Sequence, residues 1–102
     1  MQLTANEAEQ IALEFIIAEW NIPDEHRDWF TVINCRLIGH WYIIEVALAG
    51  FPDRWYFQVY DTAECDPNYT FISPIRGCEG YTDLGDLPEL LAEVLVCERN
   101  AR

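Results

Sequence analysis

The sequence contains no lysine, and its basic side chains are six arginines and two histidines. Against them stand 18 acidic residues, so the formal net charge is −12 at pH 7. Nucleic-acid binding needs several cationic side chains on one face to neutralise phosphates, and anionic membranes also attract basic segments. The charge therefore predicts that the chain binds neither nucleic acid nor a membrane. It favours either simple solubility or a basic protein partner.

Long hydrophobic runs are also missing. No apolar stretch approaches the ~18 residues of a membrane-spanning helix, and the start, MQLTANEAEQ, lacks the basic and apolar regions of a signal peptide. We therefore expect a cytoplasmic protein. The hydrophobic fraction of 51%, with 14% aromatic residues, excludes intrinsic disorder. A chain of 102 residues is expected to form one domain, 1–102, with a core of its own.

The four cysteines do not form the close C-x-x-C pairs that zinc sites use. In a reducing cytoplasm we expect free thiols. Cys35 falls in a strand pattern and Cys97 in a helix pattern, so both are expected to be small core hydrophobes. Cys65 and Cys78 lie in loop-like sequence on either side of a predicted strand. An oxidising environment would allow these two to pair.

Known catalytic motifs are absent as well: there is no G-x-S-x-G, phosphate-binding loop, G-x-G-x-x-G or H-E-x-x-H. The loop with Asp61, Glu64, Asp66 and Asn68 lacks the ligand order of an EF-hand, and we interpret it as a solvated acidic turn. No motif supports a cysteine nucleophile activated by His40. We therefore expect a protein that is not an enzyme and that holds no cofactor or metal.

Two stretches show the periodicity of helices. Residues 5–20 carry apolar residues at helical spacing, and Thr4 with Glu7 forms a capping box at the start. A second helix is predicted over 87–99, with Asp86 as its N-cap. Each helix has one apolar stripe, which must be buried against another element.

The segment between the helices reads as strands separated by short turns. Strands are predicted at 29–38, 41–49, 54–60 and 69–75. Short turns such as Gly39-His40 imply that neighbouring strands are antiparallel. The order α-β-β-β-β-α thus predicts an α+β domain, in which two helices pack on a four-stranded antiparallel meander.

The second predicted strand, within HWYIIEVALAG, is apolar on both faces, and only Glu45 interrupts it. Such a strand is normally central in its sheet and covered on both sides. Two helices can cover one face, so we expect another molecule to cover the face of Trp41 and Ile43. The alternative is that the second helix wraps to that face. If the face is an interface, Glu45 should lie at its rim or pair with Arg36 or Arg54.

Tryptophan, tyrosine and arginine are the residue types that most often dominate protein interfaces. Several of them occur close together in and after the second predicted strand. The candidate interaction surface therefore comprises Trp41, Ile43, Glu45, Arg54, Trp55 and Tyr56.

Three stretches resemble a known family: TANEAEQIA at 4–12, YIIEV at 42–46 and FQVYD at 57–61. They reproduce a helix followed by strands that end in an aspartate, and on them the N-terminal part of the chain resembles PepSY-like domains and, more loosely, small immunity proteins. The sequence departs from the family's Thr-Gly turn, since Asp61 is followed by Thr-Ala-Glu. The resemblance implies a non-enzymatic binding or inhibitory module.

Three functions remain open. The first is a protein-interaction module, of immunity or inhibitor type, that attracts a basic partner electrostatically. The second is a self-associating homodimer, structural or chaperone-like, with a symmetric interface on the second sheet face. The third is a small-ligand binder or enzyme, whose pocket between sheet and helices would converge on His40, Tyr60 and an acidic side chain. The charge and the missing motifs favour the first.

Overall fold

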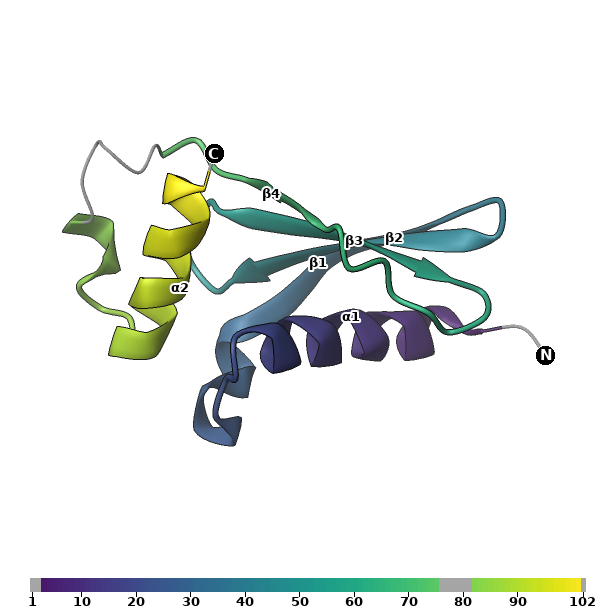
Figure 1. Cartoon of the computed structure of the whole chain (residues 1–102), viewed down its shortest axis with the longest axis horizontal. Coiled ribbons are helices and arrows are strands. Elements are labelled where there is room, and N and C mark those ends of the chain that lie inside the picture. Colours follow the sequence, from purple (N-terminus) through teal and green to yellow (C-terminus); the bar gives the residue numbers. More distant parts are fainter. Residues whose placement is uncertain (1–2, 76–81, 102) are drawn as a thin grey trace.

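The computed structural model of the chain describes residues 3–75 and 82–101. Its elements, in chain order, are α1 (Ala5–Glu19), the 3-10 helix η1 (Asp24–Trp29), β1 (Phe30–Ile38), β2 (Trp41–Leu48), β3 (Arg54–Tyr60), β4 (Thr70–Ile72), the 3-10 helix η3 (Thr82–Leu84) and α2 (Glu89–Asn100). The strands form one antiparallel sheet in the order β1-β2-β3-β4 (Figure 1). The predicted α+β fold is confirmed.

Helix α1 begins at the predicted capping box. The Thr4 backbone N–H donates to Glu7 Oε1 over 2.9 Å, and the Glu7 backbone N–H donates to Thr4 Oγ1 over 3.2 Å. These bonds satisfy donors that the first turn of a helix leaves free. The helix lies along one face of the sheet and contacts β1, β2 and β3 (Figure 1). Its buried side chains are those of Ala8, Ala12 and Ile16.

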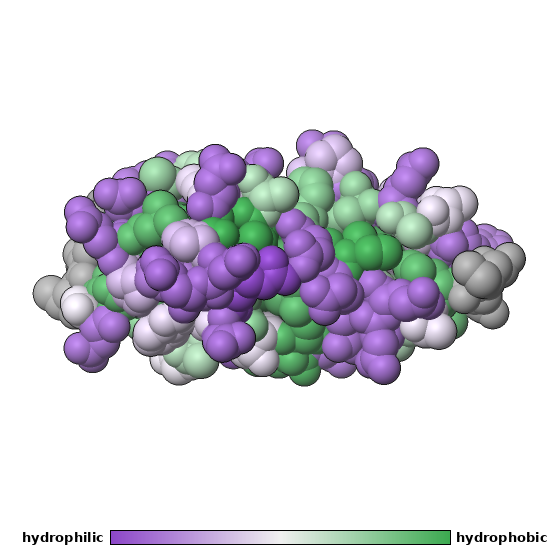
Figure 2. Space-filling view, turned by 90° about the horizontal axis from the view of Figure 1, so that it is seen from below, coloured by the Kyte–Doolittle hydropathy of each residue, from purple (hydrophilic) through white to green (hydrophobic). Residues whose placement is uncertain are grey.

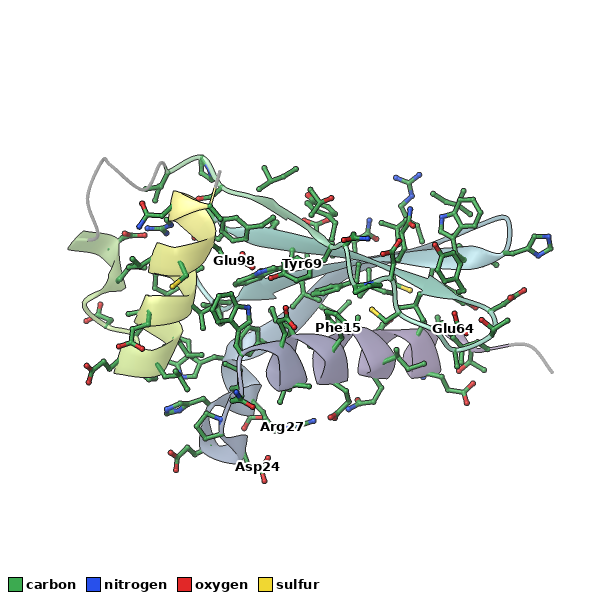
Figure 3. All side chains as sticks on the ribbon, in the orientation of Figure 1. Phe15, Asp24, Arg27, Glu64, Tyr69 and Glu98 are labelled. Atoms are coloured by element: carbon green, nitrogen blue, oxygen red, sulfur yellow. The ribbon has the colours of Figure 1, made fainter. Side chains whose placement is uncertain are left out.

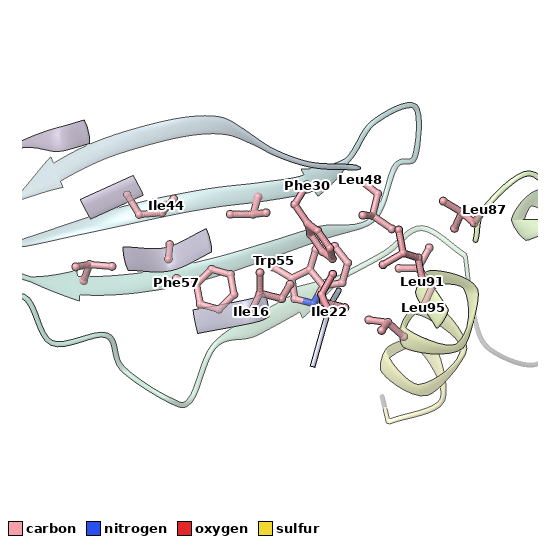
Figure 4. Close-up of a cluster of buried hydrophobic side chains, with 14 of the residues drawn as sticks. Ile16, Ile22, Phe30, Ile44, Leu48, Trp55, Phe57, Leu87, Leu91 and Leu95 are labelled. Atoms are coloured by element: carbon pink, nitrogen blue, oxygen red, sulfur yellow. The ribbon is translucent and has the colours of Figure 1, made fainter. Parts of the chain in front are cut away.

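Helix α2 stands at one end of the sheet, across the strand direction (Figure 1). It begins two residues later than predicted, because Pro88 has an extended ψ of 144° and occupies the N-cap. The prediction of Asp86 as the N-cap is therefore wrong. Pro88 offers no side-chain cap, and its carbonyl accepts the first helical hydrogen bond from Ala92 over 3.0 Å. Leu91, Val94 and Leu95 are buried toward the sheet end (Figure 4).

β3 has the predicted boundaries, β1 and β2 are each one residue shorter than predicted, and β4 differs most. Gly39, with a φ of +61°, makes the two-residue turn between β1 and β2, in a conformation that glycine adopts without strain. β4 spans only Thr70–Ile72 instead of 69–75. Pro74 follows closely, and proline has no N–H to donate to a ladder.

The sheet has two faces of different character. On the core face, toward α1, alternate residues of β2 and β3 are buried: Tyr42, Ile44, Val46, Leu48, Trp55, Phe57 and Val59 (Figure 4). The opposite face, called the outer face here, carries the residues between them. No helix in the described part of the chain covers the outer face (Figure 1). The alternative in which the second helix wraps to that face is therefore wrong.

The cysteines differ in burial. Cys35 packs partly buried against the core, as expected. Cys97 is exposed, so the prediction that it is a core residue is wrong: the buried stripe of α2 runs through Leu91, Val94 and Leu95. Cys65 is half-buried and free, whereas Cys78, its predicted partner under oxidation, lies outside the described residues. Within the described ranges, no helix is both long and apolar enough to cross a membrane.

Candidate functional site on the outer face of the sheet

Five of the six predicted surface residues share the outer face. They are Trp41, Ile43 and Glu45 of β2 with Arg54 and Tyr56 of β3, and all five are half-buried. They share a face because successive strand residues point to opposite sides. The register places Glu45 directly opposite Tyr56.

Trp55 is the exception among the predicted surface residues. Its side chain is fully buried on the core face, against the rings of Phe30 and Phe71 at 5.9 and 5.2 Å between centroids. Its Nε1 donates a hydrogen bond to Glu98 Oε2 on α2 over 2.6 Å. Trp55 therefore belongs to the core and to the contact with α2, and not to the surface.

An aromatic pair marks the hairpin end of the outer face. The ring of Trp41 meets the ring of Tyr60 edge-on, with 6.4 Å between centroids and an interplanar angle of 69°. Trp41 and Tyr60 are register partners across β2 and β3. The Tyr60 hydroxyl lies 3.4 Å from Asp66 Oδ2 and 3.5 Å from Gln58 Oε1. The surface predicted from the sequence does not include Tyr60, although the alternation of β3 places it on the same face as Tyr56, with Gln58 between them.

The one carboxylate in the middle of this face is neutralised. Glu45 Oε2 lies 3.2 Å from Arg54 Nε, which is one of the two pairings expected from the sequence. Arg54 Nη1 also donates to the carbonyl oxygens of Phe51, at 2.7 Å, and Asp53, at 3.0 Å. Arg54 is thus held at the end of β3. Because Glu45 is balanced by Arg54, the centre of the outer face presents aromatic and amphipathic surface with little net charge.

A shallow hollow of about 260 Å³ opens beside Tyr56. Its lining is mostly polar and comes from β2, β3 and the chain just before and within β4: Ile43, Tyr56, Phe57, Gln58, Asn68 and Thr70. His40 and Tyr60 do not line this hollow. The His40 side chain is 88% exposed and lies 3.5 Å from Asp61 Oδ2. The hollow beside Tyr56 is therefore not the predicted pocket of His40, Tyr60 and an acid.

A second polar cluster joins α2 to the end of the sheet and is buried. Arg99 donates from Nε and Nη2 to the two carboxylate oxygens of Asp53, each over 2.8 Å, and also contacts Asp83 at 2.9 and 3.2 Å. Hydrogen bonds to Asp53 are the main cause that raises the pKa of Arg99. Both carboxylates of this cluster pair with Arg99. The cluster anchors α2.

Tyr69 and Glu98 extend this cluster toward α1 (Figure 3). The Tyr69 ring packs against Phe15 and Phe57, with centroids 6.2 and 5.3 Å apart. Burial, and then the neighbouring Glu98, raise the pKa of the Tyr69 phenol above its usual value. Tyr69 therefore stays protonated at neutral pH, as a packing residue requires.

Comparison of the chain with protein-family models, curated proteins and solved structures found no match. The resemblance to PepSY-like domains stays a prediction. Within 3–75 and 82–101, no group of three or more His, Cys, Asp or Glu side chains is placed to hold a metal ion.

Proposed function

We propose that the chain is a non-enzymatic protein-interaction module, of the inhibitor or immunity type, that binds a basic protein through the outer face of its sheet. The observation that carries the proposal is the outer face itself. It displays Trp41 of β2 with Arg54, Tyr56 and Tyr60 along β3, and no helix in the described ranges covers them.

The composition of this face matches the anatomy of a protein interface. Interface centres are depleted in net charge and rich in tyrosine, tryptophan and arginine, whereas their rims are polar. Here the Glu45–Arg54 pair leaves the centre nearly neutral. Asp61 and Asp66 follow β3 and lie beside His40 and Tyr60, at the hairpin end of the face. The carboxylates thus border the face and do not occupy its centre.

Half of the net negative charge that would attract a basic partner lies on another side. The first 28 residues contain seven acidic residues and a single arginine. They form α1 and η1, and hydrophilic side chains run across that side of the molecule (Figure 2). A field of this sign speeds encounter with a basic protein and weakens as salt rises. The helical side therefore steers the partner, and the outer face makes the contacts.

The test uses the purified chain immobilised for capture from a lysate of its source cells. The variant Ile43→Glu places a carboxylate in the centre of the outer face, and the control Asn6→Glu adds the same group to the exposed surface of α1. We expect wild type and the control to retain the same basic protein. Ile43→Glu should retain at least tenfold less of that protein. Calorimetry with the purified partner should then show affinity that falls with salt.

Two results contradict the proposal. The first is that no basic protein is retained by wild type. The second is that Ile43→Glu retains the partner as well as the control does, which would place the contacts elsewhere on the molecule.

A further inference from the structure

The two edges of the sheet are unequal. β4 is three residues long, whereas β1, at the other edge, is nine residues long. Within the described residues, no segment pairs with the free side of β1. An edge strand of this length offers a row of backbone donors and acceptors to another strand.

Three of the four most exposed large apolar side chains in the described part of the chain lie on this same edge. In the described part of the chain they are Ile33 at 50%, Leu37 at 52% and Ile38 at 39%, all on β1, with Ile72 of β4 at 51% as the fourth. On the outer face, by comparison, the apolar residues of the central strands β2 and β3 are half-buried or buried. The exposed Ile38 and Ile72 lie at the two edges of that face, as register partners of Trp41 and Arg54. Long, apolar edge strands are normally protected against pairing with other chains. Because β1 is long and exposed, we expect a strand of another molecule to pair with it.

A bulge limits where pairing can occur. The register with β2 shifts between Val32 and Asn34, which places Ile33 in the irregularity. Bulges bend a strand and often protect edges. Beyond the bulge, residues 34–38 pair regularly with β2 up to the hairpin turn. This regular stretch, with Leu37 and Ile38, is the part of the edge that can accept a strand.

The charge of β1 indicates what the occupant is. The strand, FTVINCRLI, contains one arginine and no acidic residue, in a chain of net charge −12. A basic partner finds no carboxylate on this strand. Two copies of an acidic chain, however, repel least where they meet through a segment free of carboxylates.

We propose that residues 34–38 of β1 pair antiparallel with the same residues of a second copy, about a twofold axis. An antiparallel edge is self-complementary, as an isologous interface requires. The pairing joins two four-stranded sheets into one continuous sheet. Because the axis is perpendicular to the sheet, both outer faces lie on the same side. The dimer would use a surface distinct from the one proposed for the basic partner.

Sedimentation velocity over a series of concentrations tests the proposal with a matched pair of variants. Leu37→Lys and Ile72→Lys make the same change at nearly equal exposure on opposite edges. We expect wild type and Ile72→Lys to dimerise alike, and Leu37→Lys to raise the dimer dissociation constant at least tenfold. Both variants reduce the net negative charge by the same amount. A difference between their dimer dissociation constants therefore shows which edge of the sheet forms the dimer.

Two further readouts separate edge pairing from other causes. Backbone amides within 34–38 should exchange more slowly in the wild-type dimer than in dilute monomer. Added salt should strengthen the dimer, because it screens repulsion between like charges, whereas it should weaken binding of a basic partner. A wild-type chain that stays monomeric into the millimolar range, or equal effects of the two variants, would overturn the inference. Such a monomer could still bind a basic protein through Ile43, so the proposed function would survive.

Discussion

Replacement of Asp53 by asparagine is expected to lower the free energy of unfolding by about 3 kcal/mol. Asp53 and Arg99 are both fully buried at their side chains, and they share two hydrogen bonds of 2.8 Å. Removal of one partner from a buried ion pair leaves an uncompensated charge, which typically destabilises by roughly 3–5 kcal/mol. The lower end applies here because Asp83 still contacts Arg99 at 2.9 Å.

Urea unfolding followed by tryptophan fluorescence measures this effect, since Trp55 is buried against α2. The expected loss is a large fraction of the roughly 5–15 kcal/mol that stabilises a domain. Glu14→Gln is the matched control: it removes the carboxylate of the exposed Glu14–Arg27 pair, and we expect little change. A loss below about 1 kcal/mol for Asp53→Asn would refute the reasoning, because that is the size of an exposed pair.

A double mutant shows whether the two residues act as one unit. In the Asp53→Asn background, Arg99→Met should destabilise far less than it does in wild type, because the paired carboxylate is already gone. Additive effects of the two changes would mean that Arg99 acts through Asp83 or through packing alone.

Three further predictions concern the ends of the helices and the thiols. Thr4→Ala should lower the free energy of unfolding by about 1 kcal/mol in urea titrations, since it removes the N-cap hydrogen bond of α1. The hydrogen bond from Arg99 lowers the pKa of Asp83 below its ordinary value of 3.8. The stability that the ionised Asp83 contributes is therefore fully present above pH 3.8 and is lost as the pH falls through the pKa that Asp83 has in the folded protein. Asp83→Asn should make the urea midpoint depend less on pH over that acid range, and an unchanged pH profile would contradict the prediction. Burial raises the pKa of Cys65 to about 11, so peptide mass mapping after maleimide labelling at pH 8 should find the exposed Cys97 modified well before Cys65.

Local pattern decided most of the fold. The capping box and the helical spacing place α1 correctly, and alternation with short turns places β1, β2 and β3. The errors occur where a neighbouring residue competes with the pattern. Pro88 delays the start of α2, and Pro74 follows a β4 that is shorter than its apolar run. The helical periodicity of α2 was also compatible with a buried Cys97. In the structure, Leu91, Val94 and Leu95 form the buried side of the helix and Cys97 is exposed.

The outer face was largely predictable from period-two alternation. Trp41, Ile43 and Glu45 share one parity on β2, and the same rule applied to β3 would have excluded Trp55 and included Tyr60. The cluster that anchors α2 could not be predicted in this way. Asp53 and Arg99 lie 46 positions apart, and only the tertiary fold brings them together.

The outer residues of β2 are partly covered within the chain itself. They do not need a second layer for partial burial, because side chains of the adjacent strand lie over them: Tyr60 on Trp41, and Arg54 on Glu45. Three of the four most exposed large apolar side chains in the described ranges lie instead on the edge strand β1, and the fourth is Ile72 of β4. The aromatic outer face therefore supports the proposal of a basic partner, and the exposed β1 edge supports the proposal of a second copy. The opposite salt dependence expected of the two contacts tells them apart in a single titration series.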